Sequence, residues 1–265
     1  MARSSVMKPQ LYKWLSIVKM NLNFNGKIIA VTGAGSGIGR ETARVLAEEG
    51  AIVLMMDINA DGLNETAAIC GEQCHPIVVD LTDAQSVTNV IAQIVTEYGK
   101  IDGLVHCAGI SSRKPLNVLS KEGFSKVMDV NFYSFVELVK QCAKKKHMND
   151  GASIVVMSSI SSIRGYKAKT EYCVSKAAVD AFVRCMALEL ADRKIRVNSV
   201  MAAEVLTPLA LKARETNAAV GASDFNAPLG PSEPYEVANT IAFLLSDATK
   251  TITGTSLLID GGACA

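Results

Sequence analysis

A tyrosine and a lysine four residues apart, Tyr172 and Lys176, are the residues of this sequence best suited to proton transfer. On a helix, this spacing places both side chains on one face. A tyrosine hydroxyl with its ordinary pKa of about 10 exchanges protons poorly at neutral pH. A neighbouring ammonium group favours the phenolate and lowers that pKa, so the pair predicts general acid/base chemistry. Ser159 lies thirteen residues before Tyr172, where its hydroxyl is expected to orient a substrate oxygen.

A glycine-rich segment, TGAGSGIG at residues 32–39, lies between a predicted strand at 27–32 and a predicted helix at 38–49. Glycines let the chain turn tightly and approach a diphosphate, whose charge then lies at the N-terminus of the following helix. The spacing is Thr-Gly-x3-Gly-x-Gly and not the general G-x-G-x-x-G. A tight strand-to-helix turn without a ligand is the alternative. The context favours a dinucleotide-binding turn, whose glycines are Gly33, Gly37 and Gly39.

Asp57 is expected to end the second strand and to determine which dinucleotide binds. A carboxylate there accepts hydrogen bonds from the adenosine ribose hydroxyls and repels a 2′-phosphate. Residues 58–60 are neutral, and so is Ser36 in the turn. We therefore predict NAD(H) in preference to NADP(H). Two alternatives remain open: Asp57 caps the next helix, or Arg40 or Arg44 reaches a phosphate.

The elements that must position these residues follow from the hydrophobic pattern. Short apolar segments, typical of buried parallel strands, alternate with amphipathic helical segments. We expect strands at residues 27–32, 51–56, 75–79, 101–107, 153–157, 194–200 and 256–259. We expect helices at residues 38–49, 86–98, 124–147 and 171–191. This alternation predicts a single-domain, Rossmann-like α/β fold, a doubly wound parallel sheet of about seven strands with helices on both faces.

The domain organisation is expected to be simple. Residues 24–265 form one dinucleotide-binding catalytic domain in this interpretation, preceded by a flexible or loosely packed extension at 1–23. The segment 207–234 contains four prolines and predicts a long excursion from the domain. Loops of that length in compact domains are usually functional.

The composition narrows the possible function classes. Of 265 residues, 49% are hydrophobic and 20% are charged, which suits a globular core and excludes a disordered chain. The net charge of +1 argues against a nucleic-acid partner, and the apolar runs are too short to span a membrane. Seven cysteines in apolar segments indicate reduced thiols and a cytoplasmic protein. We expect no metal site, because Cys70, Cys74 and His75 have no fourth partner in the sequence.

From about residue 24 to residue 260, the sequence resembles the short-chain dehydrogenase/reductase family. The resemblance depends on the glycine segment at 32–39 and on Ser159 followed by Tyr172-x3-Lys176. Further matches are Asp80-Leu81, Asn131 within residues 129–133, Arg196-Val-Asn198, Thr253-Gly254 and Asp260-Gly-Gly262.

This resemblance implies hydride transfer between a nicotinamide and an alcohol or carbonyl carbon. It assigns Tyr172 as general acid/base, Lys176 as its pKa modifier and nicotinamide-ribose anchor, Ser159 as ligand of the substrate oxygen, and Asn131 as part of a proton relay. The residues expected to bind the dinucleotide are Gly33, Ser36, Gly37, Ile38, Gly39, Asp57, Asp80, Leu81, Ala108, Gly109, Tyr172, Lys176, Val205 and Thr207. The resemblance also implies a homotetramer or homodimer.

Two departures from the family pattern affect these expectations. The fourth strand usually ends Asn-Asn-Ala-Gly, whereas here it ends His106-Cys-Ala-Gly109. His106 is either a titrating group near the site or, as we favour, a buried structural histidine. Arg-Val-Asn is usually followed by Pro-Gly, whereas residues 201–203 are Met-Ala-Ala. The turn that carries Val205 and Thr207 is therefore expected to run differently.

The substrate is the least determined feature of the sequence. Arg113, Lys114 and Arg164 are expected near the site, where they either receive an anionic part of the substrate or are ordinary solvated charges. The main prediction is an NAD(H)-dependent oxidoreductase that interconverts a secondary alcohol and a ketone. One alternative is a 3-oxoacyl-thioester (acyl-carrier-protein) reductase that uses NADPH. The other is a dinucleotide-binding sensor or scaffold without turnover.

Overall fold

The computed structural model describes residues 22–211 and 227–265. The predicted extension at 1–23 lies almost entirely outside the described residues, and so does the middle of the predicted excursion at 207–234. Within the described ranges, none of the helices combines the length and apolar character that crossing a membrane requires.

The core is a seven-stranded, all-parallel sheet with the order β3-β2-β1-β4-β5-β6-β7. The strands are β1 (Ile28–Thr32), β2 (Ile52–Asp57), β3 (Cys74–Val78), β4 (Ile101–His106), β5 (Met148–Ser159), β6 (Arg196–Ala202) and β7 (Ser256–Ile259). They are mostly short runs of buried apolar residues, as burial on both faces of a parallel sheet requires. The doubly wound fold predicted from the sequence is confirmed.

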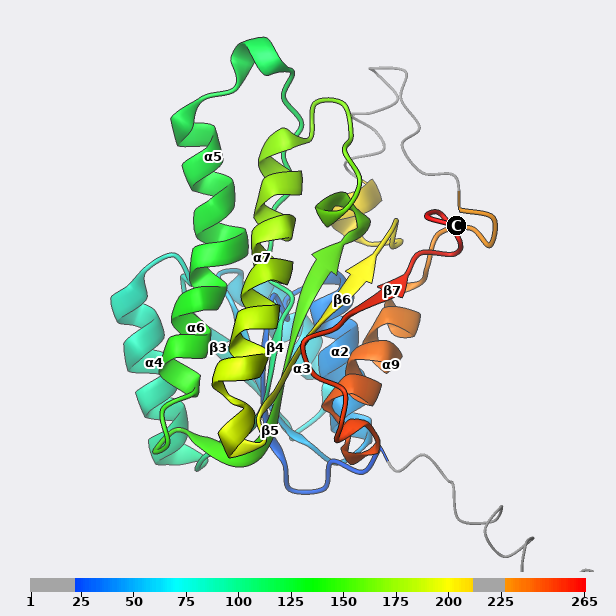
Figure 1. The fold of residues 1–265 in the computed structure, drawn as a ribbon. Coiled ribbons are helices and arrows are strands. Elements are labelled where there is room, and N and C mark those ends of the chain that lie inside the picture. The colour runs from blue at the N-terminus through cyan, green and yellow to red at the C-terminus, as the bar shows by residue number, and fades with distance from the viewer. Residues whose placement is uncertain (1–21, 212–226) are drawn as a thin grey trace, which may run out of the picture.

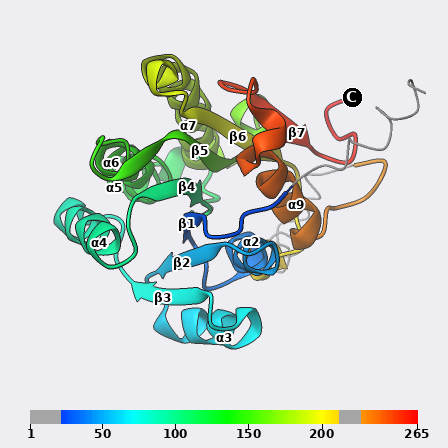
Figure 2. The same cartoon turned by 90° about the horizontal axis from the view of Figure 1, so that it is seen from below.

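Helices cover both faces of this sheet (Figures 1 and 2). One layer consists of α2 (Gly37–Glu48), α3 (Ala60–Cys70) and α9 (Pro234–Leu245). The other consists of α4 (Ala84–Glu97), α5 (Lys121–Met128), α6 (Ser134–Cys142) and α7 (Thr170–Glu189). The sheet separates two hydrophobic clusters, one containing Leu46 of α2 and Ile241 of α9, the other Phe135 of α6 and Val183 of α7.

One helical prediction needs correction, and two helices were not predicted. The helix predicted at 124–147 is wrong at both ends, and a π-helical turn, Asp129–Tyr133, interrupts it between α5 and α6. Residues 143–147, expected to close that helix, form turns before β5. The pattern also missed α3 and α9: small and polar residues dilute the apolar face of α3, and α9 begins with a proline after the capping residue Glu233.

The strand order reverses between β1 and β4, which lie side by side although β2 and β3 separate them in sequence. In the sheet register, Thr32 at the end of β1 lies opposite Met56 of β2 and His106 of β4. The loops that leave these strands therefore meet at one edge. In open α/β sheets, ligands bind at such a switch point, beyond the carboxyl ends of the strands.

Candidate active site

The glycine turn after β1 lies directly against the backbone that follows β4. Gly33 has φ +66°, and a Cβ atom there would lie 2.7 Å from the Ala108 nitrogen. A Cβ atom on Gly39 would lie 2.2 Å from the Gly33 carbonyl oxygen. Real Cβ atoms do not approach backbone this closely, so both positions require glycine. The turn thus presents backbone, and not side chains, toward the edge of the sheet.

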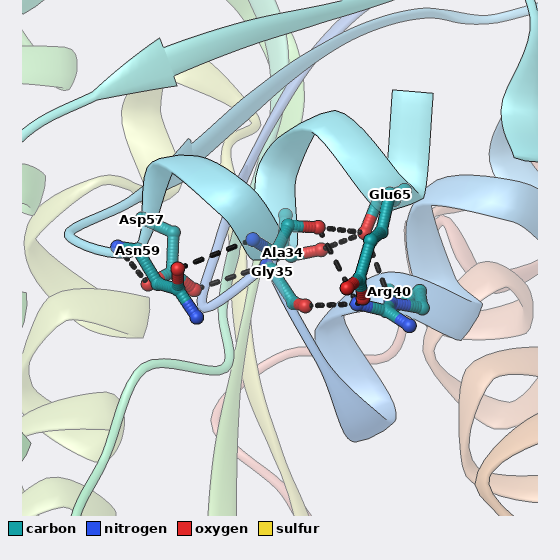
Figure 3. Close-up of polar contacts among 8 residues, drawn as sticks. Ala34, Gly35, Arg40, Asp57, Asn59 and Glu65 are labelled. Atoms are coloured by element: carbon teal, nitrogen blue, oxygen red, sulfur yellow. Dashed lines mark hydrogen bonds and ion pairs between the residues drawn. The ribbon is translucent and has the colours of Figure 1, made fainter. Parts of the chain in front are cut away.

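Polar side chains from α2, α3 and the end of β2 form hydrogen bonds with the backbone of this turn (Figure 3). The Asp57 carboxylate accepts a hydrogen bond from the Gly35 N–H at 3.0 Å. The Arg40 guanidinium donates to the Gly35 carbonyl at 2.5 Å, and the Thr66 hydroxyl donates to the Ala34 carbonyl at 2.8 Å. Two carbonyl oxygens of the turn are therefore engaged by protein donors.

The same contacts bear on two alternatives that the sequence left open. Asn59, not Asp57, is the N-cap of α3, and Asp57 accepts the Asn59 N–H at 3.0 Å. Arg40 forms an ion pair with Glu65 at 2.7 Å, in addition to its bond to the turn (Figure 3). Arg44 pairs with two glutamates of its own helix. Both arginines are therefore engaged within the chain, whereas the Asp57 carboxylate lines the cavity.

A cavity of about 390 Å³ extends along this edge of the sheet. Of the residues expected to bind a dinucleotide, its lining includes Gly33, Ser36, Gly37, Ile38, Gly39, Asp57, Asp80, Leu81, Ala108, Gly109 and Thr207. Val205 lies instead in the hydrophobic core. Strand β6 extends to Ala202, and Val205, three residues later, forms a β-bridge with Ser232. The sequence did not predict the other lining residues, which are Ile58, Val79, Thr82, Cys107, Ile110, Val130, Pro208 and Leu209.

The residues around this cavity fit a dinucleotide. Helix α2 begins at the cavity with Ser36 as its N-cap, and no side chain of the described residues caps it. N–H groups at the start of a helix bind a diphosphate well. The glycines leave room for backbone approach, and Asp57 and Ile58 lie at the end expected to receive an adenosine.

Asn131 and Lys176 both lie beside Gly109, which lines the cavity, although none of Asn131, Lys176 and Tyr172 is itself a lining residue. A Cβ atom on Gly109 would lie 3.3 Å from Asn131 Oδ1 and 3.7 Å from Lys176 Nζ. The π-helical turn directs Asn131 inward, where it accepts the Ile110 N–H at 2.8 Å and donates to the Ile110 carbonyl at 3.0 Å. Lys176, only 4% exposed, donates to the Met157 carbonyl of β5 at 2.9 Å.

Tyr172 and Lys176 lie on one face of α7, as the spacing predicts, with Lys176 Nζ 5.7 Å from the Tyr172 ring centroid. Ser159 ends β5 and bonds to the Tyr172 hydroxyl, although the sequence placed it on the following loop. Burial raises the pKa of Tyr172 to about 12, and the bond to Ser159 opposes this. Burial also lowers the pKa of Lys176 to about 8. The expected lowering of the Tyr172 pKa is therefore not found in the chain alone, because the effect of burial exceeds that of the hydrogen bond to Ser159.

His106 is a buried structural residue, as we favoured. It is 1% exposed, its Nδ1 lies 2.9 Å from the Thr32 hydroxyl, and its Nε2 lies 3.4 Å from the Ser134 hydroxyl. Burial, aided by the charge of Lys176, lowers its pKa to about 3. The neutral ring thus joins β1, β4 and α6 beneath the site. Thr32 also accepts the Ala108 N–H at 3.2 Å, a role that the sequence did not reveal.

Lys114 and Arg164, which were expected on the substrate side, are each engaged within the chain. Lys114 pairs with Glu171 at 3.4 Å. The Arg164 guanidinium donates to the Ala263 carbonyl and lies 5.7 Å from the ring centroid of Tyr166. Glu171 was not singled out in the sequence, because nothing in the pattern showed that this helical carboxylate is buried. The anionic substrate stays a prediction.

Known proteins resemble the chain over most of its length. A family model described as enoyl-(acyl carrier protein) reductase matches residues 33–264. The 3-oxoacyl-(acyl-carrier-protein) reductase FabG of Thermotoga maritima is 36% identical over 91% of this chain and 99% of its own length. The NAD-dependent glycerol dehydrogenase of Listeria innocua is 32% identical over 91% of this chain and 95% of its own.

A solved structure agrees with these matches. A short-chain dehydrogenase/reductase of Brucella melitensis, described as a glucose/ribitol dehydrogenase, superposes with a TM-score of 0.84 and 28% identity, over 92% of this chain and 98% of the other. Fold, site geometry and relatives agree. The chain belongs to the short-chain dehydrogenase/reductase family, oxidoreductases that interconvert alcohols and carbonyl compounds with a nicotinamide dinucleotide.

Proposed function

We propose that the chain is an NAD(H)-dependent oxidoreductase that interconverts a secondary alcohol and a ketone, with Tyr172 as the general acid/base. The proposal is carried by Asn131 and Lys176, which lie beside the cavity-lining Gly109, and by Tyr172, whose ring lies next to Lys176. A protein that only bound the dinucleotide would not need a tyrosine beside a buried ammonium group.

The roles follow from the geometry and the shifted pKa values. A bound nicotinamide supplies the carbon that donates or accepts the hydride. In ketone reduction, neutral Tyr172 donates its hydroxyl proton to the oxygen that becomes the alcohol, while Ser159 orients that oxygen. Lys176 adds positive charge beside the tyrosine, and Asn131 completes the relay that returns a proton from solvent. In alcohol oxidation Tyr172 must first lose its proton, which burial opposes because it raises the pKa to about 12.

The preference for NAD(H) is supported by the surroundings of Asp57. Its carboxylate lines the cavity and is fixed by the Gly35 and Asn59 N–H groups. A 2′-phosphate placed there would face this negative charge, and Arg40 is already engaged by Glu65. One relative of the chain is itself named an NAD-dependent dehydrogenase.

A 3-oxoacyl-thioester reductase is the second candidate. It is favoured by the 36% identity to a 3-oxoacyl-(acyl-carrier-protein) reductase. On this reading the substrate carbonyl would meet the same Tyr172 and Ser159, and the substrates would be thioesters.

We further propose that the protein is cytoplasmic and forms a homotetramer or homodimer. All seven cysteines are free thiols, as in a reducing compartment. Apolar side chains are exposed on and next to the outer helices, among them Tyr133, Val174 and Leu188. Light scattering of the purified protein measures the oligomeric state.

The decisive experiment compares kcat/KM for NADH and NADPH against secondary ketones, sugars and 3-oxoacyl thioesters, with Tyr172→Phe as control. The proposal predicts turnover of a ketone with NADH that vanishes in the variant. Turnover of thioesters with NADPH would establish the second candidate instead. Tight NADH binding without turnover of any compound would favour a sensor.

A further inference from the structure

A fully buried carboxylate lies immediately before the general acid/base in the sequence. Glu171, in the first turn of α7, is 1% exposed. Its Oε2 accepts a hydrogen bond from the Ser112 hydroxyl, and its Oε1 lies 3.4 Å from Lys114 Nζ. A buried carboxylate is costly unless it is paired and hydrogen-bonded. Both partners come from one segment, residues 110–115, which leaves β4 toward the site and which we call the β4 loop.

A glycine of α5 makes room for this contact. A Cβ atom on Gly123 would lie 2.2 Å from Glu171 Oε1 and 2.6 Å from Lys114 Nζ. Gly123 does not adopt the left-handed backbone conformation, so the nearby carboxylate and ammonium, and not the backbone, exclude a side chain. Three segments, α5, α7 and the β4 loop, therefore meet at one ion pair.

The β4 loop is fixed at two further points that connect it to the site. At its start, the Asn131 side chain forms hydrogen bonds with both the N–H and the carbonyl of Ile110. Ile110 lines the dinucleotide cavity. At its end, the Lys114 N–H donates to the Ala168 carbonyl at 2.7 Å, on the segment that leads into α7. Ala168 has φ +65°, an unfavourable conformation for a residue with a side chain. Between these points, Glu171 holds the side chains of Ser112 and Lys114.

We propose that Glu171 is a positioning residue whose carboxylate fixes the β4 loop beside Tyr172 and thereby shapes the substrate side of the pocket. This inference builds on the proposed function. It predicts that the contact acts on substrate binding, because neither Glu171 nor Ser112 touches the tyrosine hydroxyl or the dinucleotide turn in the contacts described above. A loop that shifts by about 1 Å can change productive substrate binding by tenfold or more.

The test disturbs the contact from both sides and measures KM and kcat separately. Glu171→Ala removes the carboxylate, and Gly123→Ala pushes against it from α5. Both are expected to raise KM for the ketone by about tenfold with kcat changed by less than about threefold. Glu171→Gln keeps an acceptor for Ser112 and should recover part of the loss. Ser125→Ala, on the exposed face of α5, is the matched control and should leave KM unchanged.

Two further readouts do not depend on turnover. Hydrogen exchange of the backbone amides should accelerate in residues 110–115 of Glu171→Ala and Gly123→Ala, but not in residues 33–39. The Kd for NADH, from fluorescence, should stay within about twofold of the parent value. Unchanged exchange in the β4 loop, or a loss of kcat at constant KM, would overturn the inference. Changed exchange in a protein without any turnover would support the inference and contradict the proposed function, so the two failures are distinguishable.

Discussion

The two ends of the cavity are built by different physical means. At the β1–β3 end, backbone groups of the glycine turn are fixed by Thr66, by Asp57 and by a partly exposed ion pair of Arg40. At the β4–β6 end, charged or titratable side chains such as Lys176 and His106 are almost completely buried. The first end is suited to recognising a ligand by backbone geometry, and the second to setting protonation states through burial.

This difference predicts two kinds of damage. Changes at the turn should weaken dinucleotide affinity and leave the pH dependence of catalysis intact. Changes at the buried charges should alter rates, pH profiles or acid stability with smaller effects on dinucleotide affinity. The following predictions separate the two ends.

The largest effect is expected from Lys176→Met. Burial already disfavours the Tyr172 phenolate, since it raises the pKa to about 12. Removal of the ammonium takes away the positive charge beside that phenolate, so kcat for alcohol oxidation should fall by about a thousandfold. The rise of the oxidation rate with pH should also move to higher pH, because the phenolate loses the stabilising positive charge of Lys176. Steady-state kinetics between pH 6 and 10 measure both. An unchanged pH profile would contradict the role given to Lys176.

Gly39→Ala should act on affinity alone. The added methyl would lie 2.2 Å from the Gly33 carbonyl oxygen, so the turn must deform. Overpacking of this kind costs about 1–3 kcal/mol, or up to about a hundredfold in the Kd for NADH. Gly165→Ala is the matched control, because its methyl would enter open space. Equal affinities of the two variants would show that the turn does not bind the dinucleotide.

Asp57→Ser should change which dinucleotide is used. Without the carboxylate, repulsion of a 2′-phosphate disappears, and the ratio of kcat/KM for NADH to that for NADPH should fall by about thirtyfold. Glu65→Gln, which loosens the hold on Arg40, should lower the ratio further when it is added. A ratio that stays constant in both variants would show that Asp57 does not determine the preference for NADH.

The smallest effect is expected from His106→Asn, and it concerns stability. The pKa of His106 falls from 6.5 in the unfolded chain to about 3 in the folded protein. The unfolded chain therefore takes up a proton first, so stability is complete above pH 6.5 and is lost as the pH falls toward 3. At pH 5 this loss amounts to about 2 kcal/mol. Urea unfolding at pH 7 and pH 5 should show a smaller acid loss in the variant, and an equal loss would contradict the assignment.

The same contrast explains what the sequence could predict. The apolar runs that form the strands, the glycine turn and the spacing of Tyr172 and Lys176 are local patterns that the sequence shows directly. The strand predicted at 153–157 was too short at both ends, because β5 runs from Met148 to Ser159. The burial of Glu171 and His106, the ion pair of Arg40 with Glu65 and the raised pKa of Tyr172 depend on contacts between segments that are distant in sequence. The π-helical turn that directs Asn131 inward likewise has no local signature, so one continuous helix was expected there.

The central claim is that Tyr172 exchanges the proton of the reaction, and the positive charge of an oxidised nicotinamide bound beside it should favour the loss of that proton. Calorimetry in buffers of different ionisation enthalpy counts the protons released on binding. At pH 8, NAD⁺ should release a fraction of a proton from the parent protein, while NADH should release much less. Tyr172→Phe should abolish the difference between the two dinucleotides. The same difference in the parent protein and in Tyr172→Phe would contradict the account.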